Sequence, residues 1–331
     1  MSKAQARWAM SRRLVLGAGL ALAARPAVAE RTPLAPPPAL GPLPASWLKA
    51  EVIPLWPGPP PNGEFKAQPV PADFPPGFFR NVAKPSLHVF RPARSNGNAV
   101  LTAPGGAYSF VVGTHEGAAV AEALAARGYT VFVLIYRLPA EGWSAFWDVP
   151  LQDAQRAMRV VRANAARFGF DPAQVAALGF SAGGHLIASL ATDHAQSLYP
   201  VVDAADALSA RPAAVGLIYP VITLDTSYTN PQTRLSLLGP SPSEDLVARR
   251  SPQRRVSATT PPCFLAHALD DTAVPPENSL MMLEALRKTG VPAEAHLLEE
   301  GGHGFGLGSP NAPDGQWLAL FDLWLQRAIA G

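Results

Sequence analysis

Residues 175–185 read VAALGFSAGGH, and this stretch decides the fold. An apolar run that suits a buried strand leads directly into Gly179-Phe180-Ser181-Ala182-Gly183, and helix-forming residues follow. The glycines on either side of Ser181 allow a sharp turn that holds a serine hydroxyl above a sheet, at a helix N-terminus. A phosphate-binding loop at the same kind of turn would need a lysine, and this turn has none. The stretch therefore predicts a nucleophilic serine between a strand and a helix.

Apolar runs and helical segments alternate from residue 85 to the end of the chain. Thr130 to Tyr136 reads TVFVLIY, a β-branched and aromatic run typical of a strand buried on both faces. This alternation predicts an α/β fold whose mostly parallel, doubly wound sheet carries helices on both faces. We expect strands at residues 87–90, 99–103, 130–136, 175–178, 214–219, 263–269 and 293–298, and helices at 116–127, 151–166, 183–192, 277–288 and 317–328.

The first thirty residues have the three parts of an export signal. A basic stretch ends in Ser11-Arg12-Arg13, an apolar run follows from Leu14 to Ala24, and Ala27-Val28-Ala29 supplies a cleavage site. Paired arginines before the apolar run resemble the twin-arginine signal, which exports folded proteins. A membrane anchor is the alternative, but so short a run cannot span a hydrocarbon core of about 30 Å. We expect residues 1–29 to be removed and the product to be periplasmic or secreted, with no stable membrane insertion.

Prolines dominate the next segment, residues 31–76. Because proline has no backbone N–H to donate, this stretch predicts an extended arm and not a packed helix. Residues 51–58 (EVIPLWPG) carry apolar side chains that could lie against the domain as an edge strand. The expected organisation is a signal peptide at 1–29, a proline-rich arm at 30–84 and one α/β domain at 85–331.

Composition and charge exclude several classes of protein. The 331 residues are 48% hydrophobic and 16% charged, which is ordinary for a globular protein and not for a disordered one. With 27 basic and 25 acidic residues, the net charge of +2 gives no reason to expect nucleic acid or an anionic membrane as a partner. The single cysteine, Cys263, can form neither an intrachain disulfide nor a multi-cysteine metal site.

A serine at its normal pKa is a poor nucleophile and needs an oriented base. Where a nucleophilic serine follows a strand in this way, the acid and the histidine come later in the chain, in that order. Residues 263–275 (CFLAHALDDTAVP) end a buried strand with two aspartates, and residues 297–305 (LLEEGGHGF) end another with a glycine-flanked histidine. His303 is the favoured base among seven histidines, because it lies after the acid in a loop that follows the last strand.

These motifs resemble those of the α/β-hydrolase esterases that include acetylxylan esterases and feruloyl-esterase-like enzymes, close to the prolyl-oligopeptidase branch. The resemblance covers roughly Leu87 to the C-terminus. It implies an α/β-hydrolase catalytic domain with Ser181, Asp271 and His303 as a catalytic triad. It rests on PGGAY at 104–108, HEG at 115–117, GFSAGGHL at 179–186, HALDDTAVPPENS at 267–279 and GGHGFGL at 301–307.

The resemblance also decides between the adjacent Asp270 and Asp271. The family pattern H-G-x-x-D-x-x-V-P places the acid four residues after a histidine and four before a proline. Counting from His267 and from Pro275 selects Asp271 both times. Asp270 is then expected to cap the turn or to face solvent, and His267, which lies within a strand, to be structural.

Backbone amides are expected to form the oxyanion hole. One is the amide of Ala182, the residue after the nucleophile, and the other comes from the loop at residues 104–108. By position, Gly106 and Ala107 are the candidate donors there, and Gly105 allows the turn. The loop reads PGGA where lipases have HGGG. Because the oxyanion is bound by backbone amides, we expect the loop to serve as an oxyanion hole despite these differences.

Tyr108, Trp143 and Trp147 are the candidate substrate-binding residues. Trp143, Phe146 and Trp147 follow a predicted strand on the catalytic side, where they could pack the loop down or stack on sugar rings. The sequence leaves both possibilities open. His115-Glu116 resembles a metal pair, but an adjacent pair lacks ligand spacing, and the start of a helix accounts for Glu116 better. No metal or organic cofactor is expected.

Resemblance and export together imply a serine esterase that removes acetyl or other small acyl groups from xylan-type polysaccharide or oligosaccharides through an acyl-enzyme. The alternatives are a general carboxylesterase and a prolyl-oligopeptidase-like peptidase, although the chain is too short for that peptidase's propeller domain. A non-catalytic carbohydrate-binding homologue is the alternative of another class, which a complete triad disfavours. The expected partner is a small-molecule or oligosaccharide ester, and the sequence leaves the oligomeric state open.

Overall fold

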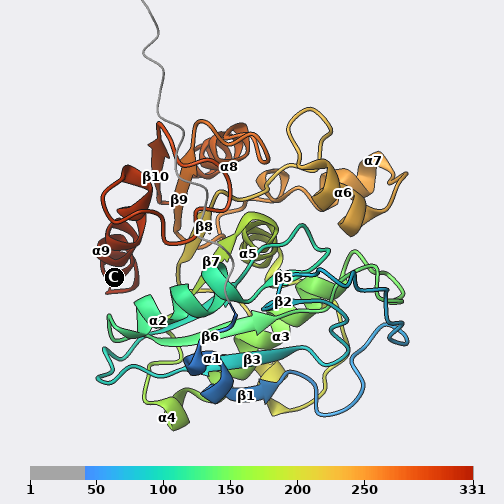
Figure 1. Cartoon of the computed structure of the whole chain (residues 1–331), viewed down its shortest axis with the longest axis horizontal. Coiled ribbons are helices and arrows are strands. Elements are labelled where there is room, and N and C mark those ends of the chain that lie inside the picture. Colours follow the sequence, from blue (N-terminus) through green and yellow to red (C-terminus); the bar gives the residue numbers. More distant parts are fainter. Residues whose placement is uncertain (1–41, 331) are drawn as a thin grey trace, which may run out of the picture. The chain divides into compact units, whose positions relative to one another are not determined.

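The computed structural model describes residues 42–330, so the predicted signal peptide and residues 30–41 of the predicted arm lie outside it. Eight strands form one sheet in the order β1-β3-β6-β4-β7-β8-β9-β10 (Figure 1). β3 runs antiparallel to both of its neighbours, and every adjacent pair from β6 onward is parallel. The sheet strands are β1 (Glu51–Pro54), β3 (Ser86–Phe90), β4 (Ala99–Ala103), β6 (Thr130–Ile135), β7 (Val175–Phe180), β8 (Val215–Ile218), β9 (Cys263–Ala268) and β10 (Ala293–Leu298), while β2 (Phe78–Phe79) and β5 (Val111–Val112) pair separately.

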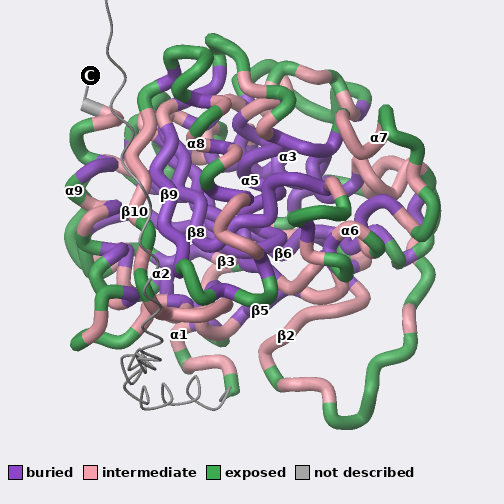
Figure 2. The backbone as a smooth tube through the Cα atoms, turned by 90° about the horizontal axis from the view of Figure 1, so that it is seen from above, coloured by how far each residue is buried: buried purple, intermediate pink, exposed green. Residues whose placement is uncertain are grey.

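Helices cover both faces of this sheet, which confirms the predicted α/β-hydrolase architecture. α3 (Val149–Ala163), α5 (Ser181–Asp193) and α8 (Glu277–Thr289) lie on one face and α2 (Ala119–Ala125) on the other (Figure 2). α9 (Trp317–Ala330) packs on β9, where the rings of Phe321 and Phe264 are 5.5 Å apart. The other helices are α1 (Ala45–Lys49), α4 (Ala165–Phe168), α6 (Pro231–Leu238), α7 (Glu244–Arg249), a π-helical turn at Thr114–Ala118, and 3₁₀ turns at Ala204–Ala207, Pro252–Arg254 and Pro313–Gly315.

The central strands form where the sequence predicts them because they are buried on both faces. Every residue of β4, β6 and β7 is buried, and a strand in that position needs a continuous apolar run with many β-branched side chains. No helix within residues 42–330 has the length and apolar character needed to cross a membrane.

The proline-rich arm is more structured than the sequence predicts. β1 pairs with β3 as an edge strand, which confirms the expectation for residues 51–58. α1, in contrast, is a short packed helix within the arm, and its Trp47 is buried. The Trp47 ring stacks on His88 of β3 with centroids 4.2 Å apart. Burial of this large aromatic side chain stabilises a helical turn that proline content alone argues against.

A buried ion pair attaches the arm to α3. The guanidinium of Arg137 donates to both carboxylate oxygens of Asp153 at 2.8–3.0 Å, and to the carbonyl oxygen of Pro61 in the arm at 2.6 Å. The indole N–H of Trp56, also in the arm, donates to the same carboxylate at 2.8 Å. Both charged side chains are fully buried. One hydrogen-bonded network therefore holds together the arm, the loop after β6 and the start of α3.

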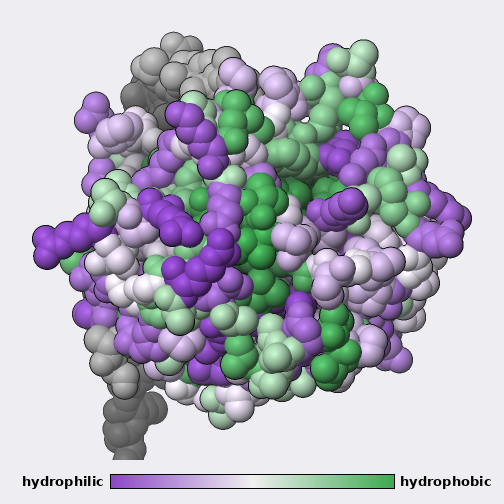
Figure 3. Space-filling model, turned by 90° about the horizontal axis from the view of Figure 1, so that it is seen from below, coloured by the Kyte–Doolittle hydropathy of each residue, from purple (hydrophilic) through white to green (hydrophobic). Residues whose placement is uncertain are grey.

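Charged side chains border the free edge of the sheet. Glu51 of β1 pairs with Arg91 at 3.1 Å and with Arg167 at 2.6 Å. Val52 on the same strand is exposed. Figure 3 shows this side of the molecule, where hydrophilic side chains interrupt the apolar surface. Charges along an edge strand oppose pairing with the edge of another sheet.

Replacing Arg137 by methionine should lower the free energy of unfolding by about 3–5 kcal/mol, because the carboxylate of Asp153 would stay buried without its cation. Urea unfolding followed by tryptophan fluorescence measures the change. Arg91→Met is the matched control, since its ion pair with Glu51 is exposed and such pairs contribute about 0–1 kcal/mol. Small and equal effects of the two substitutions would contradict the structural role given to Arg137.

Candidate active site

Ser181 lies at the junction of β7 and α5. Its backbone φ is +51°, in the left-handed region that residues other than glycine rarely adopt. A β-carbon on Gly179 would lie 2.4 Å from the carbonyl oxygen of Gly183, and one on Gly183 would lie 2.1 Å from that of Ala103. The turn therefore requires both glycines, and it places the serine hydroxyl at the carboxyl end of the parallel strands.

Of the three residues predicted as a triad, His303 lies within hydrogen-bond distance of both Ser181 and Asp271. Nε2 of His303 is 2.9 Å from Oγ of Ser181, and Nδ1 of the same ring is 2.7 Å from Oδ2 of Asp271. The three side chains come from the ends of β7, β9 and β10. They meet because the carboxyl ends of parallel strands lie along one edge of the sheet. The His303 side chain is 24% exposed, so solvent reaches the imidazole.

Asp271 is a buried carboxylate that is well supplied with hydrogen-bond donors. Its Oδ1 accepts from the backbone amides of Ala273 and Val274 at 2.9 and 2.8 Å. Burial alone would raise the pKa of Asp271, but hydrogen bonds, first those with His267 and His303, outweigh burial and lower the pKa to about 2. The carboxylate is therefore ionised at neutral pH and can orient the His303 ring.

Two neighbours of the triad make contacts that the sequence analysis did not foresee. Nε2 of His267 is 3.2 Å from Oδ2 of Asp271 and 2.9 Å from the carbonyl oxygen of Val274, and because a carbonyl only accepts, this nitrogen carries a proton. Asp270 is exposed, as expected, and in addition it accepts a hydrogen bond at 2.8 Å from the amide of Gly302, in the loop that carries His303. The spacing from His267 to Asp271 was the available signal for the first contact.

Three consecutive residues of the loop at residues 104–108 have positive φ. φ is +126° at Gly106 and +52° and +55° at the two residues that follow. The amides of Gly106 and Ala107 donate to no other group within residues 42–330. Ala182 is in the first turn of α5, where helix amides have no intrahelical acceptor. The three amides predicted as oxyanion donors therefore remain available to a ligand.

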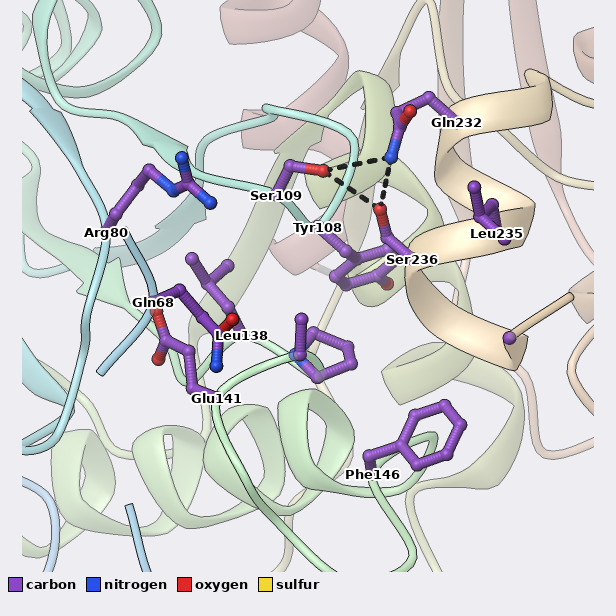
Figure 4. A pocket seen from close by; sticks show the side chains of 13 residues that line it. Gln68, Arg80, Tyr108, Ser109, Leu138, Glu141, Phe146, Gln232, Leu235 and Ser236 are labelled. Carbon is purple, nitrogen blue, oxygen red and sulfur yellow. Dashed lines mark hydrogen bonds between the residues drawn. The ribbon is translucent and has the colours of Figure 1, made fainter. Parts of the chain in front are cut away.

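A cavity of about 420 Å³ lies beside this loop (Figure 4). Tyr108 and Ser109, which continue the loop, form part of its wall. Polar side chains reach it from two further segments, Gln68 and Arg80 from the arm and Gln232 from α6. Glu141, Ser236 and Gly239 also line it, together with the apolar residues Leu138, Pro139, Ala140, Phe146 and Leu235. Such a mixture of polar and apolar groups suits a ligand with hydroxyl groups and apolar faces.

Tyr108 lines the cavity, but its hydroxyl group points into the protein. The hydroxyl lies 2.8 Å from Nδ1 of His185, whose Nε2 lies 2.7 Å from the carbonyl oxygen of Arg250. Burial lowers the pKa of His185 to about 4, so the ring is neutral at pH 7. Its one proton is then on Nε2, and Tyr108 donates to Nδ1. This contact holds the far end of the loop in place.

The two tryptophans proposed for substrate binding do not line this cavity. Trp143 is buried, and the guanidinium of Arg137 lies 4.9 Å from the centroid of its ring. Trp147 packs against the core and forms an edge-to-face pair with Phe146, at 5.0 Å between centroids. Phe146 is the aromatic residue of this loop that faces the cavity.

Part of the cavity wall comes from a helix that the sequence analysis left unassigned. α6 begins with Asn230, whose side chain accepts from the amide of Thr233, and Pro231 occupies its first position. An asparagine cap followed by proline is an N-terminal helix signal, and it could have predicted α6. Gln68 and Arg80 have no comparable signal, because an extended arm gives no periodicity that shows which side chains point inward.

Within the described part of the chain, no cluster of three or more histidine, cysteine, aspartate or glutamate side chains could hold a metal ion. In the adjacent pair His115-Glu116, the carboxylate of Glu116 is buried and bonds instead to the amide of Gly105 and the hydroxyl of Tyr219.

Two curated proteins are similar to this chain in sequence. The chain is 32% identical over 247 residues to an acetylxylan esterase from Xylanibacter ruminicola, covering 73% of this chain and 47% of that protein. It is 35% identical over 209 residues to endo-1,4-beta-xylanase B from Butyrivibrio fibrisolvens, covering 62% of this chain and 32% of that protein. The chain thus spans about a third and about a half of the length of these two relatives.

Among solved structures, the chain resembles an acetyl ester-xyloside bifunctional hydrolase from Caldicellulosiruptor lactoaceticus. The TM-score is 0.71 at 33% sequence identity, and the match covers 87% of this chain and 98% of that chain. The sequence model of the BD-FAE family matches residues 87–286, which include Ser181, Asp271 and the loop at 104–108. The chain therefore belongs to the BD-FAE family and has the α/β-hydrolase fold.

Proposed function

We propose that this protein is a serine esterase that hydrolyses acetyl or other small acyl esters on xylan-type polysaccharide or its oligosaccharides. The observation that carries the proposal is the chain of contacts from Ser181 through His303 to Asp271, at 2.9 and 2.7 Å. Three unpaired amides lie next to the serine in the sequence and in the adjoining loop. This set of groups is what acyl transfer to a serine requires.

In the proposed reaction, Nε2 of His303 takes the proton from Oγ of Ser181 as this oxygen attacks the ester carbonyl carbon. The carboxylate of Asp271 accepts from Nδ1–H and stabilises the imidazolium that forms. The amides of Ala182, Gly106 and Ala107 donate to the developing oxyanion. The imidazolium then protonates the departing alcohol oxygen, which leaves an acyl-enzyme. A water molecule, deprotonated by His303, attacks this ester and releases the carboxylic acid.

The substrate class is inferred from the relatives and from the cavity together. The names of the similar proteins refer to acetylxylan, to acetyl esters with xylosides and to xylan. The cavity beside the oxyanion loop is lined by the polar side chains of Gln68, Arg80, Glu141 and Gln232 and by the ring of Phe146. A sugar ring offers hydroxyl groups at its edge and an apolar face, so it is complementary to such a wall.

Export is part of the proposal. The twin arginines, the apolar run and the A-x-A site would send the folded enzyme to the periplasm or the medium, where polysaccharide fragments are found. Replacing Arg12 and Arg13 by lysines should keep the protein in the cytoplasm at full length. Cell fractionation and N-terminal sequencing test this, with Glu30 expected as the first residue of the exported wild-type protein. Export of the lysine variant would contradict a twin-arginine route.

Ser181→Ala should lower kcat for p-nitrophenyl acetate by at least about 10⁴-fold without changing the fold, because no other group can form the acyl-enzyme. Asp271→Asn should cost about 10⁴-fold, since the imidazole would lose its orientation and its counter-charge. Asp270→Asn is the matched control and should keep kcat within about tenfold of the wild-type value, because the asparagine oxygen can still accept from the amide of Gly302 and only the negative charge is lost. Greater damage from Asp270→Asn would reverse the assignment of the acid.

A substrate panel tests the proposed specificity. Acetate release is measured from acetylated xylan, acetylated xylooligomers and acetylated pectin, beside ferulate esters, a proline peptide and p-nitrophenyl xyloside. We expect kcat/KM to be highest on the acetylated xylooligomers, because a sugar ring in the cavity would lie beside the loop that is proposed to hold the oxyanion. Activity on p-nitrophenyl acetate without activity on any carbohydrate acetate would favour the general carboxylesterase.

A further inference from the structure

Glu116 is a buried carboxylate directly behind the oxyanion loop. It lies on the π-helical turn Thr114–Ala118 and is 3% exposed. Its Oε2 accepts a hydrogen bond from the amide of Gly105 at 2.6 Å, and its Oε1 accepts one from the hydroxyl of Tyr219 at 2.9 Å. Among the ion pairs of residues 42–330, none involves Glu116. The carboxylate is thus held by two neutral donors that belong to different loops.

Tyr219 connects this carboxylate to the loop that carries the histidine. It follows β8, is fully buried and has a φ of +37°. Its hydroxyl oxygen accepts a hydrogen bond from the amide of Gly306 at 3.1 Å. Its ring packs edge-on against His303, with centroids 5.1 Å apart, and against Phe305 at 4.5 Å. The same side chain therefore contacts the triad histidine and the loop that follows it.

The direction of each bond in this network is fixed by chemistry. An amide can only donate, so the Tyr219 oxygen accepts from Gly306 and its own proton goes to Glu116. Burial, with the adjacent carboxylate, raises the pKa of Tyr219 well above its ordinary value, so the hydroxyl keeps that proton. The result is one continuous path from the amide of Gly306 through Tyr219 and Glu116 to the amide of Gly105.

The loop at the end of this path has an unfavourable backbone conformation, although backbone hydrogen bonds from Ser109 and Phe110 to the carbonyl oxygen of Gly106 support it. It has three consecutive residues with positive φ, from Gly106 onward, and two of them are not glycine. A β-carbon on Gly105 would lie 2.8 Å from Cβ of Ser181 and 2.9 Å from Oε2 of Glu116. Backbone in sparsely populated regions persists only where its surroundings determine it. Glu116 supplies that constraint on one side of the loop, as the Tyr108 contact with His185 does on the other.

We propose that Glu116 and Tyr219 are positioning residues that set the oxyanion loop and the His303 loop in one common geometry. The inference rests on the proposed esterase function. Neither side chain touches the substrate: the carboxylate directs the amide of Gly105 inward, and the next two amides are then turned toward the oxyanion. A buried charge without a cation is costly, and a neutral residue would serve simple packing better. A carboxylate is present despite the free-energy cost of burying it because its two oxygens can accept hydrogen bonds from both loops at once.

Tyr219→Phe and Glu116→Gln test the proposal. Phenylalanine keeps the ring contacts and removes only the hydroxyl, and glutamine keeps the volume but can accept at only one of its two terminal atoms. We expect kcat for p-nitrophenyl acetate to fall about 10- to 100-fold in each variant, with KM changed by less than about threefold, because misplaced donors weaken the transition state more than the substrate. Values of kcat are referred to active sites titrated with a p-nitrophenyl phosphonate, so partly unfolded protein does not enter them.

A second readout separates positioning from stability. A boronic acid forms a tetrahedral adduct with Ser181 whose oxygen occupies the oxyanion hole, so its inhibition constant should rise by the same factor as kcat falls. The double variant should lose about as much as the worse single variant, since residues of one network are not additive. Losses that multiply would contradict a single network.

Tyr199→Phe is the matched control. The hydroxyl of Tyr199 donates to Oδ1 of Asp206 at 2.8 Å, and the amide of Val202 donates to Oδ2 at 2.9 Å, so the same pair of donors is found away from the site. This variant should keep kcat and the boronate constant at wild-type values, whatever its melting temperature.

The outcomes distinguish the inference from the proposed function. If Tyr219→Phe and Glu116→Gln lower the melting temperature but keep kcat and boronate affinity, the two residues are structural and the inference is wrong. If wild-type protein is not labelled by the phosphonate and Ser181→Ala does not differ from it, the esterase function itself is wrong.

Discussion

The site depends on how closely the first turn of α5 approaches the end of β4. A β-carbon on Gly183 would lie 2.1 Å from the carbonyl oxygen of Ala103 and 2.4 Å from that of Pro104, so the approach is possible only for glycine. This contact brings the amide of Ala182 next to the loop that begins at Pro104. The nucleophile and both sources of oxyanion donors are thus fixed by one backbone contact between two buried elements, before any side chain is considered.

The second half of the site is built from loops, and these are held by polar side chains, of which Asp271, Glu116 and Tyr219 are buried and Asp270 is exposed. Asp271 orients the imidazole of His303, while the adjacent Asp270 holds the loop before it through the amide of Gly302. Glu116 and Tyr219 hold the loop after it and the oxyanion loop. Buried polar networks of this kind are costly when incomplete and rigid when complete. The loops can therefore keep catalytic distances although they have no regular secondary structure.

The sequence was sufficient for the features that depend on local pattern. β4 and β10 match the expected strands to the residue, and Ser181, His303 and Asp271 come together as their motifs predict. Contacts between segments far apart in the chain could not be predicted from local sequence patterns. Glu116 and Tyr219 are 103 residues apart, and no motif around either residue predicts its contact with the other. The packed turn around Trp47 escaped prediction for the same reason, because its partner His88 lies on a strand outside the arm.

Catalyst and cavity come from different parts of the fold, and this division bears on specificity. The triad residues and the loop at 104–108 follow the ends of β4, β7, β9 and β10, and every residue of β4, β7 and β9 is buried. The cavity wall comes from the arm, the loop after β6 and α6, which lie outside the sheet. Substitutions in these segments can change what binds without disturbing the strands that hold Ser181. Side chains such as Arg80 and Gln232 lie outside the motifs that identify Ser181, Asp271 and His303, so those motifs do not determine how the cavity is lined.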